Sequence, residues 1–179
     1  MNNKQFSRFI MLLCALIGEA SVAQAEGNNV FIEQVSAANS AEVRQSGQAN
    51  RVTIVQRGHD GQVSLQQRGS ASSANVRQDG SANVSRVVQH GHGNRVTQTQ
   101  MGSSNQAIAE QYGNGNVIEQ RLEGQDNRVE NTQRGNHNHA DVTFDGNYNT
   151  LVNRQNGDGN SYSIQHTGNG LNMTVTQTQ

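Results

Sequence analysis

Polar and apolar residues alternate along most of this chain, and the alternating segments recur at one fixed interval. Val52 and Ile54 are separated and flanked by polar residues, the pattern of a strand with one buried face. Asn50 and Gln56, two residues before and after this pair, lie on the same face because side chains alternate across a strand. The pattern predicts short strands that each turn an asparagine, two apolar residues and a glutamine toward the interior.

The interval, eleven positions from Gly47 to Gly58, holds without a slip to the end of the sequence. With asparagine as position zero, glutamine falls at position six and glycine at position eight, and Gly61 and Ser72 fill two asparagine positions. The asparagines and glutamines expected to form hydrogen-bonded ladders, as in cross-β fibrils, are Asn39, Gln45, Asn50, Gln56, Gln67, Gln78, Asn83, Gln89, Asn94, Gln100, Asn105, Gln111, Asn116, Asn127, Gln133, Asn138, Asn149, Gln155, Asn160 and Gln177. The glycines expected in turns, where positive φ has no steric cost, are Gly47, Gly58, Gly69, Gly80, Gly91, Gly102, Gly113, Gly124, Gly135, Gly146, Gly157 and Gly168.

Charged residues test this assignment independently. From Glu33 onward, every arginine and every acidic residue avoids positions zero, two, four and six. Because burying an unpaired charge is costly, these four positions mark a real interior. Positions zero, two, four and six share one face of a strand but not of a helix, so the helical alternative fails.

Departures from the unit recur at twice the repeat interval rather than at the interval itself. The pairs are Gln98 with Gln120, Asn131 with Asn153, and Leu122 with Phe144. Residues two units apart should therefore stack directly above one another. The sequence predicts an all-β fold, a cross-β solenoid of about seven 22-residue strand-turn-strand-turn coils, with parallel in-register pairing and a height of about 34 Å.

Residues 1–25 have the features of a secretory signal peptide. Lys4 and Arg8 are basic, an apolar run follows, and Ala23-Gln24-Ala25 is a small-x-small cleavage site. We expect the repeat domain to occupy residues 26–179. The only cysteine, Cys14, would be removed with the leader, so neither a disulfide nor thiol chemistry is expected.

Composition excludes several classes of protein. The hydrophobic content is 32%, the aromatic content 4% and the mean hydropathy -0.77, a profile typical of disorder, but the chain has no proline, which favours sheet. Without Lys4, Arg8 and Glu19 the balance is 11 basic and 13 acidic residues, a net charge of -2, so no field attracts nucleic acid or anionic lipid.

Candidate catalytic and metal-binding groups lack the geometry that their chemistry needs. The pairs His90-x-His92 and His137-x-His139 are not separated by a whole number of coils, so they would not stack, and they are interpreted as exposed turn histidines. No nucleophile, base and orienting group recur together, and no unit carries an insertion that could build a cleft. We therefore expect no enzyme activity, no cofactor and no metal site.

The segment Gln89-His90-Gly91-His92-Gly93-Asn94-x5-Gln100 resembles the curlin repeat, serine-x5-glutamine-x-glycine-x-glycine-asparagine-x-alanine-x3-glutamine. Ser72-x5-Gln78-x-Gly80 and Gly113-x-Gly115-Asn116 are similar to parts of it. The resemblance implies a secreted structural subunit of curli, the amyloid fimbriae that Gram-negative bacteria use for adhesion and biofilm matrix. It also implies partners: further copies of the chain, a sister curlin subunit, and secretion and accessory proteins at the outer-membrane surface.

Two questions stay open at the level of sequence. The arginine-rich outer positions and the absence of a glycine-rich segment before the repeats resemble the minor, nucleating subunit, whereas fourteen regular units would also suit the major one. The repeats reach Gln179 without room for a capping segment, so we expect open ends that allow end-to-end polymerisation. The alternative is a monomeric secreted β-solenoid adhesin, which would need caps.

Overall fold

In the computed structural model, residues 9–14, 19–23 and 27–179 are described, and all of their regular structure is β-strand. The strands are β1 Phe9–Cys14, β2 Glu19–Ala23, β3 Asn29–Val35, β4 Ser40–Gln48, β5 Arg51–His59, β6 Gln62–Ser70, β7 Ser73–Ser81, β8 Val84–His92, β9 Arg95–Ser103, β10 Gln106–Asn114, β11 Val117–Gln125, β12 Arg128–Arg134, β13 His139–Asp145, β14 Thr150–Asn156, β15 Ser161–Thr167 and β16 Asn172–Thr178. The described part of the chain contains no helix that is long and apolar enough to cross a membrane.

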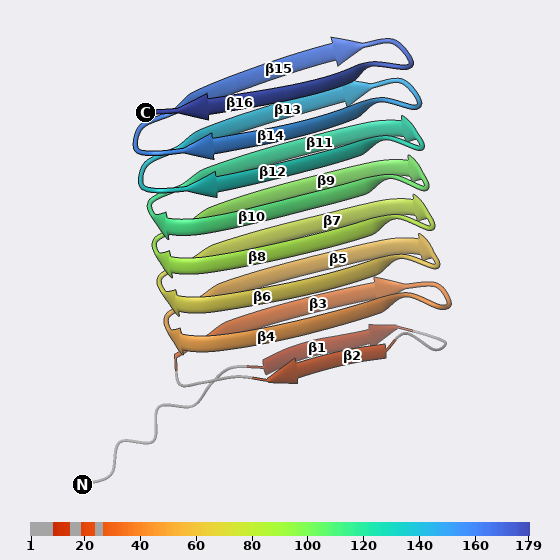
Figure 1. Cartoon of the computed structure of the whole chain (residues 1–179). Helices are drawn as coiled ribbons and strands as arrows, with labels where there is room; N and C mark the ends of the chain where they lie inside the picture. The colour runs from red at the N-terminus through yellow and green to blue at the C-terminus, as the bar shows by residue number, and fades with distance from the viewer. Residues whose placement is uncertain (1–8, 15–18, 24–26) are drawn as a thin grey trace, which may run out of the picture.

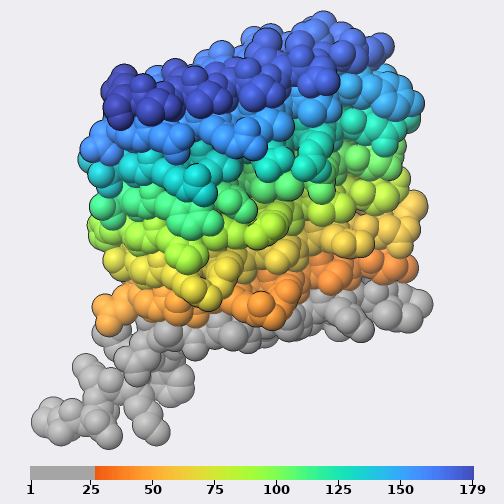
Figure 2. Space-filling model, viewed as in Figure 1, coloured from red at the N-terminus to blue at the C-terminus, as the bar shows by residue number. Residues whose placement is uncertain are grey.

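The strands form two parallel sheets that face each other (Figure 1). The odd-numbered strands make sheet A, in the order β1-β3-β5-β7-β9-β11-β13-β15. The even-numbered strands make sheet B, and they too follow one another in sequence order, from β2 to β16. From β3 to β16 every strand pairs in one constant register, in which Val52 lies beside Ala74 and Gln45 beside Gln67. The predicted solenoid of about seven 22-residue coils is confirmed. Figure 2 shows the coils as successive bands along one axis.

β1 and β2, which fall within the predicted leader, extend each sheet by one strand. Phe9 pairs with Val30 and Glu19 with Ser40, so each pair is separated by one residue fewer than the pairs within the repeats. This first coil is therefore one residue out of register with the repeats. Lys4, Arg8 and part of the predicted cleavage site lie outside the described residues, so cleavage near residue 26 stays a prediction.

Two positions of the repeat have positive φ, of which the sequence predicted one, position eight. The prediction that its glycines lie in turns is wrong for most of them, because those from Gly47 to Gly124 lie near the ends of strands, and only Gly135, Gly146, Gly157 and Gly168 lie outside strands. Gly113, at position eight, has φ +122°, and a Cβ there would lie 2.0 Å from the carbonyl oxygen of Gly135 in the next coil. Only glycine fits this backbone contact. The second position is ten, just before the asparagine, where Ala49 and Asp60 have φ 58° and 59°. Several glycines, such as Gly93, occupy position ten. In other units alanine, serine or aspartate occupies it, so the sequence gives no consistent sign of the positive φ.

Each sheet contributes one layer of side chains to the interior, and two apolar clusters of different composition follow one another along the axis. One buried apolar cluster extends from Val30 to Ala140 and uses mainly valine, isoleucine and alanine. A second lies toward the C-terminal end and contains Leu122, Phe144 and Leu151. Residues 27–179 contain both clusters and the fourteen strands β3 to β16.

Candidate functional site

The predicted ladder residues line the interior. Those from Asn39 to Asn160 are all buried, with at most 5% of their surface exposed, and Gln177 is partly exposed at the C-terminal edge. The solenoid brings them together because equivalent residues of successive coils occupy the same place on adjacent strands. Side chains from sequence-distant units thus form continuous columns parallel to the axis.

The glutamine column of sheet B is uninterrupted. Nε2 of Gln45 donates to Oε1 of Gln67 at 2.7 Å, and the same bond repeats through every rung to Gln155, which donates to Gln177 at 2.8 Å. The bonds between these ends join Gln67, Gln89, Gln111, Gln133 and Gln155 at 2.7–3.0 Å. Most of these Nε2 atoms also bond to a backbone carbonyl of sheet A, as Gln111 does to Arg95 at 3.0 Å. The column therefore fixes both the stacking and the spacing of the sheets.

The glutamine column of sheet A stops halfway along the axis. It joins Gln34, Gln56, Gln78 and Gln100 at 2.8–2.9 Å. In the next coils Leu122 and Phe144 occupy its place and belong to the second apolar cluster. Nε2 of Gln100 turns instead to the carbonyl oxygen of Asn105 at 2.8 Å, so its amide stays satisfied where the column ends.

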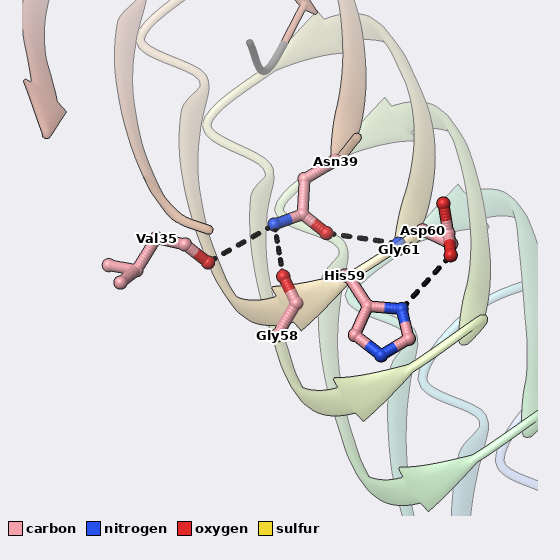
Figure 3. A network of polar contacts seen from close by, with 6 residues as sticks. All are labelled: Val35, Asn39, Gly58, His59, Asp60 and Gly61. Atoms are coloured by element: carbon pink, nitrogen blue, oxygen red, sulfur yellow. Dashed lines mark hydrogen bonds and ion pairs between the residues drawn. The ribbon is translucent and has the colours of Figure 1, made fainter. Parts of the chain in front are cut away.

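The asparagine column bonds mainly to the backbone, which differs from the predicted amide-to-amide ladder. Figure 3 shows Asn39, whose Nδ2 donates to the Gly58 carbonyl at 2.7 Å and whose Oδ1 accepts from the Gly61 N–H at 3.0 Å. Nδ2 also reaches the Val35 carbonyl at 3.3 Å. Asn39, just before β4, thus connects the start of that strand to the end of β5 in the adjacent coil.

Position four carries a polar block where both sheets depart from the repeat. Nε2 of Gln98 donates to Oε1 of Gln120 at 2.7 Å, and Ser85 bonds to Gln98 from the opposite sheet. Asn131 and Asn153 pair in register in sheet B and are completely buried. In both residues, neither Nδ2 nor Oδ1 has a hydrogen-bond partner among the described residues. Because buried polar groups without partners are costly, these two asparagines lower the stability of the interior.

Two parts of the hydrogen bonding were not predicted from the sequence. Gln34 begins the sheet A column, and its position six residues after Asn28 would have revealed it. An exposed column of asparagine and aspartate side chains follows the strand ends: the Asn114 N–H bonds to Asn136 Oδ1 at 3.0 Å, and the Asn136 N–H to Asp158 Oδ1 at 2.7 Å. Their separation by one whole coil was the available signal.

The outer faces hold the charged residues. Most ion pairs join residues one or two apart, such as Arg128 with Glu130 at 3.0 Å, and two join adjacent strands, Arg57 with Glu33 and Arg86 with Glu110. On sheet B the His90 and Tyr112 rings lie 5.3 Å apart, and the Arg134 guanidinium lies 5.6 Å from the Tyr112 ring. The prediction of turn histidines is wrong for three of the four: His90 and His92 lie at the end of β8 and His139 begins β13, and only His137 lies between strands. The His92 ring contacts the Ser70 hydroxyl. In the part of the chain that the structure describes, no three histidine, cysteine or acidic side chains converge as metal ligands would.

The C-terminal edge is formed by β15 and β16, which pair on one side only within the described structure. Their inward residues Tyr162, Ile164, Met173 and Val175 are only half-buried, whereas the equivalent residues in the middle of the stack are buried. Burial raises the pKa of Tyr162 above its ordinary value. The cross-section of the interior, with its unpaired strand backbones, is thus presented at this edge.

Comparison with known proteins adds no identification. No protein-family model, curated protein or solved structure matches the chain. The class that the structure defines is a parallel two-sheet β-solenoid with interior amide columns.

Proposed function

We propose that this chain is a structural subunit of an extracellular, curli-type amyloid fibre, which grows by end-to-end stacking of solenoids. The observation that carries the proposal is the C-terminal edge. β15 and β16 present strands in the spacing of the repeat, together with the half-buried interior residues. Such an edge is a template for further strands unless something covers it.

A second copy stacked on this edge would continue the hydrogen bonds that join successive coils. Every interior coil is bonded on both sides by two parallel strands, a glutamine column and asparagine contacts. A copy placed on the edge would continue these bonds without changing its own conformation, so little ordering entropy opposes its addition. It would also cover apolar surface on Ile164, Met173 and Val175.

The biological setting follows from the leader and from the resemblance to curlin repeats. We place the chain outside a Gram-negative cell, after export and removal of residues 1–25, in fimbriae that serve adhesion and the biofilm matrix. Its partners are copies of itself, a sister curlin subunit, and secretion and accessory proteins at the outer-membrane surface. The function is structural rather than enzymatic, and the role of major or nucleating subunit depends on how the chain acts on the sister subunit.

The test follows residues 26–179 after release from denaturant. Thioflavin fluorescence and electron microscopy should show fibres, and sonicated fibres should shorten the lag of fresh monomer. Seeding of a sister curlin subunit by trace amounts would assign the nucleating role, and seeding only in bulk would assign the major one. A protein that stays a soluble β-rich monomer and never seeds would contradict the proposal and favour the adhesin.

A further inference from the structure

A hollow on the outer face of sheet A, here called the sheet A hollow, lies between two arginines. It has a volume of about 190 Å³ and is lined by residues of β5, β7 and β9. Arg51 pairs in register with Ser73, and Ser73 with Arg95, so the two arginines flank the serine along the axis. A second row of lining residues runs beside the first and consists of Thr53, Asn75 and Thr97.

Every polar side chain around the sheet A hollow can donate a hydrogen bond. The guanidinium groups of Arg51 and Arg95 only donate, the serine and threonine hydroxyls can donate, and the Asn75 amide carries two N–H groups. No acidic residue is among those that line the hollow. The local charge is therefore positive, although the repeat domain as a whole has a slight negative charge.

Arg51 and Arg95 also differ from the other arginines on this face. The others each form an ion pair with an acidic side chain, and they are Arg57, Arg77 and Arg121. Among the described residues, neither Arg51 nor Arg95 has an acidic side chain within ion-pair distance, and both are exposed. Their charges are thus available to a ligand.

The spacing of the strands allows one small anion to contact both arginines. Neighbouring parallel strands are about 4.8 Å apart, so the Cα atoms of Arg51 and Arg95, two strands apart, are separated by about 10 Å. The short side chain of Ser73 leaves the space between them open. An anion in this space would offset two positive charges that are otherwise held near each other by the fold.

We infer that the sheet A hollow binds a tetrahedral oxyanion, phosphate or sulfate, either free or carried as an ester on a larger molecule. The two guanidinium groups donate to it from opposite sides, and Ser73 donates from below. A phosphate or sulfate offers three or four acceptor oxygens to these donors, whereas a carboxylate offers two. The inference is independent of the proposed function, because all the lining residues belong to one chain.

Binding should also stabilise the solenoid. The donors come from three successive strands of sheet A, so they lie together only in the folded chain. A ligand that binds the folded state and not the unfolded state raises the free energy of unfolding. Phosphate and sulfate also stabilise folded proteins without specific binding, so the effect has to be measured as a difference between variants.

Phosphorus NMR of inorganic phosphate, titrated with the full chain, tests the site. With the wild-type chain the phosphate signal should shift or broaden in a saturable way. Arg51→Gln and Arg95→Gln keep a long polar side chain and remove its charge. Each should weaken phosphate binding about ten- to a hundredfold, because hydrogen bonds from a charged group are lost.

Arg154→Gln is the matched control. Arg154 is exposed on sheet B, forms no ion pair among the described residues and lies between Thr132 and Thr176, but no second arginine lies in that row within two strands. Its replacement should leave both the phosphate affinity and the phosphate-dependent rise in melting temperature unchanged. Equal affinities of Arg51→Gln and Arg154→Gln, or no saturable binding by the wild-type chain, would overturn the site.

Ser73→Leu separates the hollow from its charges, because it fills the space and leaves both arginines in place. It should abolish saturable phosphate binding while circular dichroism shows an unchanged β-sheet spectrum. Binding as tight as that of the wild-type chain would overturn the site and assign the attraction to exposed arginines in general.

Two further probes define the ligand. Acetate should compete with phosphate at least about tenfold more weakly than sulfate does, because it has fewer acceptor oxygens; equal competition would overturn the assignment to a tetrahedral oxyanion. Methyl phosphate distinguishes the source, since binding as tight as that of inorganic phosphate supports an esterified group and much weaker binding supports the free ion. A chain that binds phosphate but never forms fibres would contradict the proposed function and leave this site intact.

Discussion

Replacing Gln111 by leucine tests whether the sheet B column stabilises the solenoid. Gln111 is fully buried, accepts from Gln89 at 2.9 Å, and donates to Gln133 and to the Arg95 carbonyl, both at 3.0 Å. Leucine fills a similar space but removes all three bonds. The cost therefore depends on which of the partners can be satisfied in another way.

The natural end of the sheet A column shows what the neighbours can do. Gln100, whose next rung is Leu122, turns its amide to the Asn105 carbonyl five residues on. In the variant, Gln89 can turn to Asn94 in the same way, because the local sequence pattern is the same. Oε1 of Gln133 has no such alternative, so one buried acceptor is orphaned at a cost of about 1–3 kcal/mol. We expect the free energy of unfolding to fall by this amount.

The assay is guanidinium unfolding of residues 26–179, followed by circular dichroism at a concentration too low for assembly. Gln106→Leu, in the same strand but on the outer face, is the matched control and should change stability by less than about 0.5 kcal/mol. The double variant Gln89→Leu/Gln111→Leu should lose less than the sum of the two single losses, because their mutual bond is counted once. Equal midpoints for Gln111→Leu and Gln106→Leu would refute the view that the column stabilises the fold.

Three further predictions address other parts of the structure. Replacing both Asn131 and Asn153 by valine should raise the free energy of unfolding in guanidinium, by about 1–3 kcal/mol, because their amides have no partners among the described residues; a lower value would show that the amides are bonded. Gly113→Ala should lower the melting temperature more than Gly93→Ala, since a Cβ at Gly113 would meet a carbonyl at 2.0 Å and one at Gly93 would meet nothing within 4 Å; equal losses would contradict the backbone contact. Burial raises the pKa of Tyr162, so the folded state resists its ionisation, and stability should fall as pH rises from about 10 through the folded pKa; stability measured against pH should lose part of this fall in Tyr162→Phe, and an unchanged fall would assign it to other groups.

The repeat phase alone was sufficient to predict the solenoid, the length of its coil and the buried columns. Amide and apolar residues recur at the positions that point inward in every coil, and charged residues avoid these positions. The periodicity of the sequence therefore predicts which side chains are buried. The sequence could not predict that Asn39 bonds to turn backbone rather than to another asparagine, because that depends on how close the Gly58 carbonyl approaches. It also missed the positive φ at position ten, where Ala49 and Asp60 give no common chemical signal.

The partners of Asn131 and Gln100 were equally beyond the sequence. Both are polar residues at interior positions, yet the Gln100 amide finds a backbone carbonyl and the Asn131 amide finds nothing among the described residues. The difference lies in the neighbouring strand and the local depth of the core, which periodicity does not describe.

The constant register between coils also determines how such a chain can change length during evolution. Duplication or loss of a whole coil would leave every column in phase on both sides of the junction. An insertion of a single residue would turn interior side chains outward for the rest of that strand, because the side-chain period is two. The number of coils can therefore vary between descendants of one gene far more easily than the length of any one coil.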